Sequence, residues 1–112
     1  MSPDFVRVCA TADIPPGTVM AAEVNDTPLA IVHADDGEFY AAYDECSHAQ
    51  IPLSEGEVDG CTLECWLHGS RFDLRTGKPS GPPATEPVPV YPTHIADGDL
   101  YVSLVPSNGV NP

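Results

Sequence analysis

Short runs of β-branched and aromatic residues recur along the chain, and prolines and glycines separate them. In one run Tyr101, Ser103 and Val105 alternate with Val102 and Leu104, which is the period-2 pattern of a half-buried strand. Thirteen prolines and nine glycines interrupt the sequence too often for long helices. The pattern predicts an antiparallel all-β domain of roughly eight to ten short strands. The strand-like runs are residues 5–11, 18–24, 29–34, 38–43, 88–95 and 100–105.

Polar turn residues fall between several of these runs. Asn25-Asp26, Asp35-Asp36-Gly37 and Asp97-Gly98-Asp99 carry the side chains that favour tight hairpin turns. A chain of 112 residues has room for a single core, so one domain is expected over residues 1–105. Residues 106–112, which follow the last strand-like run, are expected to form a flexible tail.

The segment from about residue 44 to residue 83 differs from its surroundings. It is richer in cysteine, histidine, glycine and proline, and it contains only short strand-like pieces such as residues 61–65. We interpret this segment as a loop-rich subdomain that a rigid β scaffold carries, because loops on a scaffold commonly hold the functional groups.

Seventeen acidic residues against four basic ones give a formal net charge of −13. Such a charge repels nucleic acid and anionic membrane surfaces and favours partners with basic faces. No apolar run approaches the roughly 18 residues of a membrane span, and the first residues do not resemble a signal peptide. We therefore expect a cytoplasmic protein that binds neither nucleic acid nor membranes. In that reducing compartment cysteines serve as metal ligands or free thiols rather than as disulfides.

Two short pairs of metal-binding residues stand out. Cys46 and His48 have one residue between them, Cys65 and His68 have two, and sixteen residues separate the pairs. Two thiolates and two imidazoles suit Zn²⁺ or an iron–sulfur cluster rather than Mg²⁺ or Ca²⁺. Structural zinc more often has roughly two to four residues between paired ligands, so the first pair is unusual for zinc.

The sequence CSHAQIPLSEGEVDGCTLECWLHGSRFDLRTGKPSGPPA, residues 46–84, resembles the two cluster loops and the proline-rich third loop of Rieske [2Fe–2S] ferredoxins. The resemblance implies the Rieske fold, an antiparallel β-sandwich or barrel-like scaffold with a loop-rich cluster-binding subdomain. It also implies one [2Fe–2S] cluster, with Cys46 and Cys65 binding one iron and His48 and His68 binding the other.

The resemblance also bears on the reduction potential. Neutral imidazoles in place of two thiolates raise it to roughly −150 to +300 mV, from about −400 mV in plant-type ferredoxins. Ile51 and Leu67 stand where high-potential Rieske proteins carry an additional disulfide, and Phe72 stands where they carry a tyrosine, whereas Ser70 matches their serine. With fewer hydrogen bonds to sulfur, we expect the low-potential type. Nearby carboxylates act in the same direction: Asp44, Glu45, Glu55, Glu57, Asp59 and Glu64.

The remaining cysteines and histidines lie outside the motif. Cys9 is expected to be a buried small hydrophobic residue, and a disulfide between Cys9 and Cys61 is not expected. His33 and His94 are single histidines near strand ends, which suits ordinary surface or edge positions. Trp66 lies between the ligands of the second pair, where we expect it to cover the cluster.

Prolines and basic residues follow the second pair. Pro82 and Pro83 are expected to stiffen the third loop. Arg71, Arg75 and Lys78 account for three of the four basic residues, and Arg71 or Arg75 is expected to pair with Asp73 or another loop carboxylate.

No nucleophile with an adjacent base and no phosphate-binding loop is visible, so we predict an electron carrier rather than an enzyme. The resemblance implies that it passes electrons from a flavin-containing, NAD(P)H-dependent ferredoxin reductase to the terminal Rieske non-heme iron oxygenase of an aromatic-ring-hydroxylating dioxygenase system. Three alternatives remain open: a Rieske ferredoxin of iron–sulfur cluster assembly, a small subunit of a nitrite-reductase-like complex, and a structural zinc module.

Overall fold

The computed structural model describes residues 5–34, 36–45, 52–65, 71–79 and 87–110. Short strands dominate these residues, which confirms the predicted all-β class. They are β1 (Phe5–Ala10), β2 (Thr18–Val24), β3 (Thr27–His33), β4 (Phe39–Tyr43), β5 (Glu57–Asp59), β6 (Thr62–Glu64), β7 (Arg71–Asp73), β8 (Val90–Tyr91), β9 (Thr93–Ala96) and β10 (Asp99–Ser103). Two single-turn 3₁₀ helices, η1 (Thr11–Asp13) and η2 (Leu53–Glu55), connect them.

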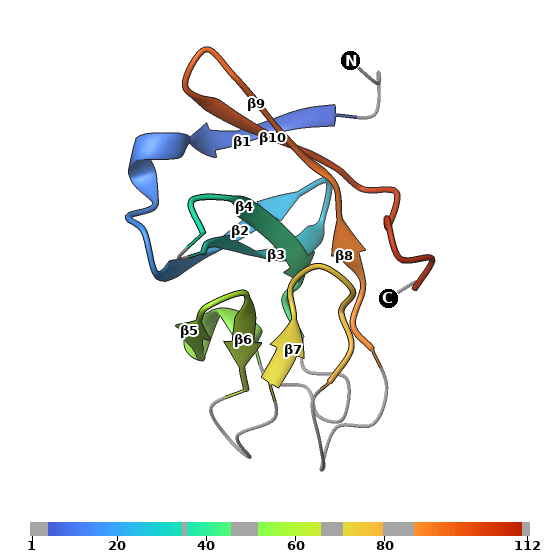
Figure 1. Ribbon diagram of the computed structural model, residues 1–112. Coiled ribbons are helices and arrows are strands. Elements are labelled where there is room, and N and C mark those ends of the chain that lie inside the picture. Colours follow the sequence, from blue (N-terminus) through green and yellow to red (C-terminus); the bar gives the residue numbers. More distant parts are fainter. Residues whose placement is uncertain (1–4, 35, 46–51, 66–70, 80–86, 111–112) are drawn as a thin grey trace.

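The strands form three antiparallel sheets (Figure 1). One sheet has the order β1-β10-β9, and the second has the order β2-β3-β4-β8. The third, β5-β6-β7, lies at the opposite end of the molecule from β1, β9 and β10 (Figure 1). The segment expected to consist mainly of loops therefore contains a small sheet of its own, built from strands of three residues each.

The hairpin turns follow the predicted turn chemistry. Asn25 and Asp26, between β2 and β3, have φ angles of 49° and 67°. Asp97 and Gly98, between β9 and β10, have φ angles of 53° and 79°. Positive φ at both central residues matches the twist of the flanking strands and favours Asn, Asp and Gly. At the third predicted turn Gly37 has a φ of 86°, whereas Asp35 lies outside the described residues.

The core consists of two hydrophobic clusters on opposite faces of β3. Leu29 and Ile31 pack in one cluster, while Ala30 and Val32 pack in the other, and all four are 0% exposed. Burying each large aliphatic side chain contributes roughly 1.5–3 kcal/mol. The first cluster joins β3 to β1, β8 and β10 through Cys9, Tyr91, Leu100 and Val102. The second joins β3 to the small sheet through Leu53, Leu63, Cys65, Phe72, Leu74, Val88 and Val90.

Ser107 and Asn108, which belong to the segment 106–112 expected to form a flexible tail, make hydrogen bonds to the rest of the fold. The Ser107 amide donates to the Val90 carbonyl oxygen at 2.8 Å. The Asn108 side chain hydrogen-bonds to Thr76, Val88 and Val90. These contacts attach the segment after β10 to β8 and to the turn that follows β7.

No helix among the described residues is long and apolar enough to cross a bilayer.

Candidate metal centre

Cys65 is the one predicted ligand within the described residues. It directly follows β6, it is 0% exposed, and it belongs to the hydrophobic cluster that joins β3 to the small sheet. Its thiol makes no hydrogen bond to another described residue. Cys46, His48 and His68 lie outside the described residues, so their arrangement around Cys65 remains a prediction.

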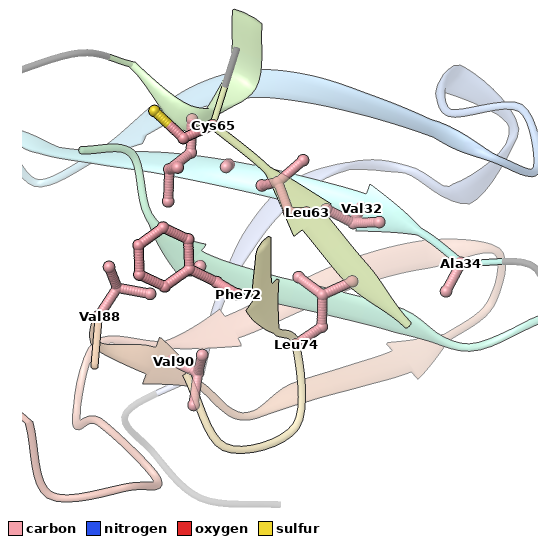
Figure 2. Packing of buried hydrophobic residues seen from close by; sticks show 11 residues of the cluster. Val32, Ala34, Leu63, Cys65, Phe72, Leu74, Val88 and Val90 are labelled. Atoms are coloured by element: carbon pink, nitrogen blue, oxygen red, sulfur yellow. The ribbon is translucent and has the colours of Figure 1, made fainter. Parts of the chain in front are cut away.

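Residues 46–51, 66–70 and 80–86 lie outside the described residues, and each of these ranges is flanked by residues that the structure describes. Described residues that border them share one core cluster, since Leu53, Cys65, Phe72 and Val88 pack together. In Figure 2 the Phe72 ring lies between the side chains of Cys65 and Val88. The three borders therefore converge around Cys65.

A carboxylate joins the described residues on the two sides of residues 46–51. Asp44 Oδ1 accepts a hydrogen bond from the Ser54 amide at 2.6 Å, and Asp44 Oδ2 accepts one from Ser54 Oγ at 2.7 Å. The Asp44 amide in turn donates to the Pro28 carbonyl oxygen at 3.0 Å, which connects it to β3. Asp44 and Ser54, which flank residues 46–51 in the sequence, are thus held together by two hydrogen bonds. Sequence reasoning noted the charge of Asp44 and missed this contact.

Strand pairing joins the described residues on the two sides of residues 66–70. Glu64 lies opposite Arg71 in the β6–β7 register, and Arg71 Nε is 3.0 Å from Glu64 Oε2. Arg71 Nη1 also lies 3.4 Å from Asp59 Oδ2. The predicted pairing of Arg71 with a carboxylate of this segment is confirmed. Because about half of the Arg71 side chain is exposed, these ion pairs contribute little to stability.

The third border lies where β7 turns towards β8. Phe72 forms an isolated bridge with Pro79, and the Val88 amide donates to the Gly77 carbonyl oxygen at 2.9 Å. Gly77 has a φ of +76°, and a Cβ there would collide with the Val88 carbonyl oxygen, so this close approach requires glycine. Pro82 and Pro83 lie outside the described residues, and so do Ile51, Trp66, Leu67 and Ser70.

Phe72 is 1% exposed and packs in the same cluster as Cys65. Its ring carries no hydroxyl group and offers no hydrogen bond to a sulfur atom. The packing is consistent with the sequence-based expectation that this side of the site has few donors. The expected low potential itself remains a prediction.

A polar cluster at the end of β6 opposite to Cys65 was not predicted. Asp36 Oδ2 accepts hydrogen bonds from Tyr40 Oη at 2.8 Å and from Cys61 Sγ at 3.2 Å, and Arg75 Nη2 lies 3.4 Å away. The Glu38 amide donates to Asp36 Oδ1 at 2.9 Å. The cluster ties the β3–β4 connection to the β5–β6 turn, so it braces the small sheet against the scaffold. The turn at Asp36 is visible in the sequence, but its contact with Cys61, twenty-five positions away, is not.

These contacts shift the proton equilibria of the cluster. The Glu38 amide, followed by Cys61 and Tyr40, lowers the pKa of Asp36 to about 2. Burial, followed by the hydrogen bond to Asp36, raises the pKa of Tyr40 to about 12. The hydrogen bond to Asp36 also raises the pKa of the Cys61 thiol, which keeps it protonated as a donor.

Other cysteines and histidines occupy structural positions. Cys9 is 8% exposed within the core, which confirms its prediction as a buried hydrophobic residue, and both Cys9 and Cys61 are free thiols. His33 stacks on Phe39 with ring centroids 4.1 Å apart, and its Nδ1 lies 2.9 Å from the Ile14 carbonyl oxygen. His94 is exposed on β9.

The donor set fits a mixed cysteine–histidine cluster. The described residues contain no group of three or more metal-binding side chains, because Cys65 is the only member of the motif among them. A buried cysteine in an apolar layer provides the thiolate and the dry surroundings that an iron–sulfur cluster requires. The four motif residues therefore suit a [2Fe–2S] cluster with two thiolate and two imidazole ligands.

Comparisons with known proteins agree with this chemistry. Residues 4–92 match the family model of the Rieske [2Fe-2S] domain. The chain is 38% identical over 104 residues to ferredoxin CarAc of Metapseudomonas resinovorans, covering 92% of this chain and 96% of that protein. It is 40% identical over 100 residues to the 3-phenylpropionate/cinnamic acid dioxygenase ferredoxin subunit of Escherichia coli K12, covering 88% and 92%.

A solved structure shows the same fold. It is a complex of reduced oxygenase and oxidized ferredoxin in carbazole 1,9a-dioxygenase, and one chain superimposes with a TM-score of 0.81 and 38% identity. The match covers 91% of this chain and 94% of that one. The Rieske fold and one Rieske-type [2Fe–2S] cluster follow from these likenesses together with the motif, and the chain belongs to the Rieske [2Fe–2S] domain family.

Proposed function

We propose that this protein is the ferredoxin component of an aromatic-ring-hydroxylating dioxygenase system. It carries single electrons from an NAD(P)H-dependent flavin reductase to a terminal Rieske non-heme iron oxygenase, and it performs no catalysis itself. The observation that carries the proposal is the 40% identity to a 3-phenylpropionate/cinnamic acid dioxygenase ferredoxin subunit over about nine-tenths of the chain, and 38% identity to ferredoxin CarAc supports it. A dioxygenase ferredoxin subunit among the relatives and a solved complex of oxygenase with ferredoxin support the oxygenase as partner, whereas the reductase follows from the family resemblance.

In this proposal Cys46 and Cys65 bind one iron, and His48 and His68 bind the other. When bound, the cluster supplies one-electron redox chemistry at a potential that its two neutral ligands raise. The protein holds Cys65 in an apolar layer with Phe72 and Val88, which excludes water from that side. Because carbon side chains surround Cys65, few donors stabilise additional negative charge there, in line with the expected low potential.

The rival functions predict different properties. A structural zinc module would bind zinc and show no redox activity, and the match to the Rieske family disfavours it. A subunit of a nitrite-reductase-like complex would co-purify with a large reductase subunit. A role in iron–sulfur cluster assembly would pair the same cluster with a different electron acceptor. The cytoplasm, where NAD(P)H is available, suits both the proposed function and this last alternative.

The proposal is tested by electron paramagnetic resonance on the dithionite-reduced protein, with iron and zinc measured on the same sample. We expect two irons per chain and an S = ½ signal whose average g value lies below that of all-cysteine clusters. Reduction by NADH through a dioxygenase reductase, followed by product formation with the cognate oxygenase, would then identify the system. One zinc per chain and no signal, in protein produced with sufficient iron, would contradict the proposal.

Replacement of His68 with cysteine provides a test of the ligand set. A thiolate adds a negative charge to the cluster, so His68→Cys should lower the midpoint potential towards that of plant-type ferredoxins. Spectroelectrochemical titration measures the change, and His94→Cys, at an exposed position of β9, is the matched control. An unchanged potential in a cluster-loaded His68→Cys variant would exclude His68 as a ligand.

A further inference from the structure

The Asn108 side chain is saturated with backbone hydrogen bonds. Its Nδ2 donates to the carbonyl oxygens of Thr76 and Val88, each at 2.9 Å. Its Oδ1 accepts from the amides of Val90 at 3.3 Å and Val110 at 3.2 Å. An asparagine side chain has two donor hydrogens and two acceptor lone pairs, so every hydrogen-bonding position is used. An asparagine in a flexible tail would bond mainly to water, so four bonds to the backbone indicate that Asn108 has a fixed position.

These bonds join the two ends of one chain segment. Thr76 precedes and Val88 follows the stretch that contains residues 80–86, the proline-rich loop of the sequence motif. The same two ends meet through the hydrogen bond from the Val88 amide to the Gly77 carbonyl oxygen. Asn108 fills the remaining space, because a Cβ at Gly77 would lie 2.7 Å from Asn108 Nδ2. Asn108, which lies after β10 in the sequence, therefore joins Thr76 to Val88.

The residues that Asn108 holds lead directly to the cysteine ligand. Val88 and Val90 are 1% and 3% exposed, and their side chains pack in one cluster with Phe72 and Cys65. Figure 2 shows Val88, Phe72 and Cys65 in succession, with Val90 beside them. A shift of the Val88 backbone would move the packing layer that supports Cys65, because buried side chains are close-packed and transmit displacements.

We propose that Asn108 is a positioning residue of the iron–sulfur site. It fixes the backbone at Thr76 and Val88 and, through Val88 and Phe72, the surroundings of Cys65. The inference rests on the proposed function only in that Cys65 binds the cluster. Asn108 lies beyond residues 4–92, which match the family model, so this control of the site comes from a part of the chain outside that match.

The test compares Asn108→Ala and Asn108→Asp with Ser107→Ala. Asn108→Ala removes all four bonds, whereas Asn108→Asp keeps the size but turns carboxylate oxygen towards two carbonyl oxygens. Ser107→Ala is the control, since it removes only the 3.3 Å bond to the Val90 carbonyl oxygen and keeps the 2.8 Å amide bond. On cluster-loaded protein, well below the unfolding temperature, we measure iron release to a chelator, the midpoint potential and the g values.

Both Asn108 variants should release iron at least about fivefold faster than the wild type and Ser107→Ala. Their potential should rise, because a displaced packing layer of Val88 and Phe72 admits water to Cys65, and water stabilises the additional charge of the reduced cluster. A purely structural role would lower the unfolding temperature and leave the potential and g values of the folded protein unchanged. That result would overturn the proposal.

Hydrogen exchange on the wild type keeps the proposal testable if the variants do not fold. Because coupling is reciprocal, removal of the cluster should accelerate exchange in peptides containing Val88, Val90 and residues 107–110, with little change in β2 and β3. Equal exchange with and without the cluster would refute the coupling. Absence of a cluster in the wild type would instead refute the proposed function, so the two failures are distinguishable.

Discussion

At the scale of single residues, Asp36 brings together groups from three parts of the chain. Tyr40, Cys61 and Arg75 all approach its Oδ2 atom, and Glu38 binds its Oδ1 atom. The pKa of Asp36 is about 2, below its ordinary value of 3.8. The ionised Asp36 carboxylate therefore stabilises the folded state fully above pH 3.8, and this stabilisation is lost as the pH falls towards 2. The pKa of Tyr40 is raised, so the neutral Tyr40 hydroxyl stabilises the folded state fully below pH 10, and this stabilisation is lost as the pH rises towards 12. The brace is therefore intact throughout the neutral range.

Asp36→Asn should lower the pKa of Tyr40 from about 12 towards the ordinary value of 10. The shift should be partial, because burial is the larger cause and remains in the variant. Absorbance titration at the phenolate band measures it, with Tyr40→Phe assigning the transition among the four tyrosines. Asp97→Asn makes the same charge change in an exposed hairpin turn and should leave Tyr40 unaffected. An unaltered Tyr40 transition in Asp36→Asn would show that the hydrogen bond contributes nothing in solution.

At the scale of elements, the small sheet carries a pair of like charges. Glu57 on β5 lies directly opposite Glu64 on β6, and like charges at such positions are unfavourable. Arg71 forms ion pairs with Glu64 and Asp59. Glu57 forms no ion pair with any of the described residues. The sheet that borders the metal centre is therefore less stable than its geometry allows.

Glu57→Lys should stabilise the protein by about 0.2–1 kcal/mol, because it replaces a repulsive cross-strand pair with an attractive one. Urea unfolding at low ionic strength measures the gain, which should diminish as salt is added. Glu23→Lys is the matched control: Glu23 is exposed on β2 and lies opposite Pro28. An equal gain in both variants would attribute the effect to net charge instead of the pair.

Elements defined by neighbouring residues were predictable from the sequence. The turns at Asn25-Asp26 and Asp97-Gly98 depend on local backbone preferences, and the cysteine–histidine pairs depend on spacing. Residues 61–65, which contain β6, were recognised as strand-like, but the β5-β6-β7 sheet was not predicted, since strands of three residues are too short to show a period. The contacts of Asn108 and of Asp36 join residues far apart in the chain, and no local pattern encodes them.

At the scale of the whole molecule, the negative charge dominates. The net charge is −13, and three of the four basic residues, Arg7, Arg71 and Arg75, already form ion pairs with carboxylates of the same chain. The field around the protein is therefore almost wholly negative, which favours encounter with a partner that has a basic surface.

Electron transfer from the reductase should slow as ionic strength rises from about 20 mM to about 200 mM, because salt screens the attraction between the proteins. Stopped-flow reduction of the ferredoxin at each salt concentration measures the rate. Dithionite, a small anion, is the control, and its rate should increase with salt because screening weakens repulsion. If the rate of reduction by the reductase does not depend on salt, the net charge of −13 does not assist docking and contributes only to solubility.

The pairing of β1 with β10 affects the order in which the protein can mature. β1 is translated before every other described strand and β10 after them, yet Phe5 pairs with Ser103 and Ala10 pairs with Asp99. The other two sheets use only residues between Thr18 and Tyr91, so the strands of both can pair in a nascent chain before β10, the partner of β1, has been synthesised. Cys9 lies opposite Leu100 of β10 and is buried in the same cluster, so we expect its thiol to be more exposed until β10 has been synthesised. Its loss of reactivity towards a maleimide would therefore report the pairing of β1 with β10.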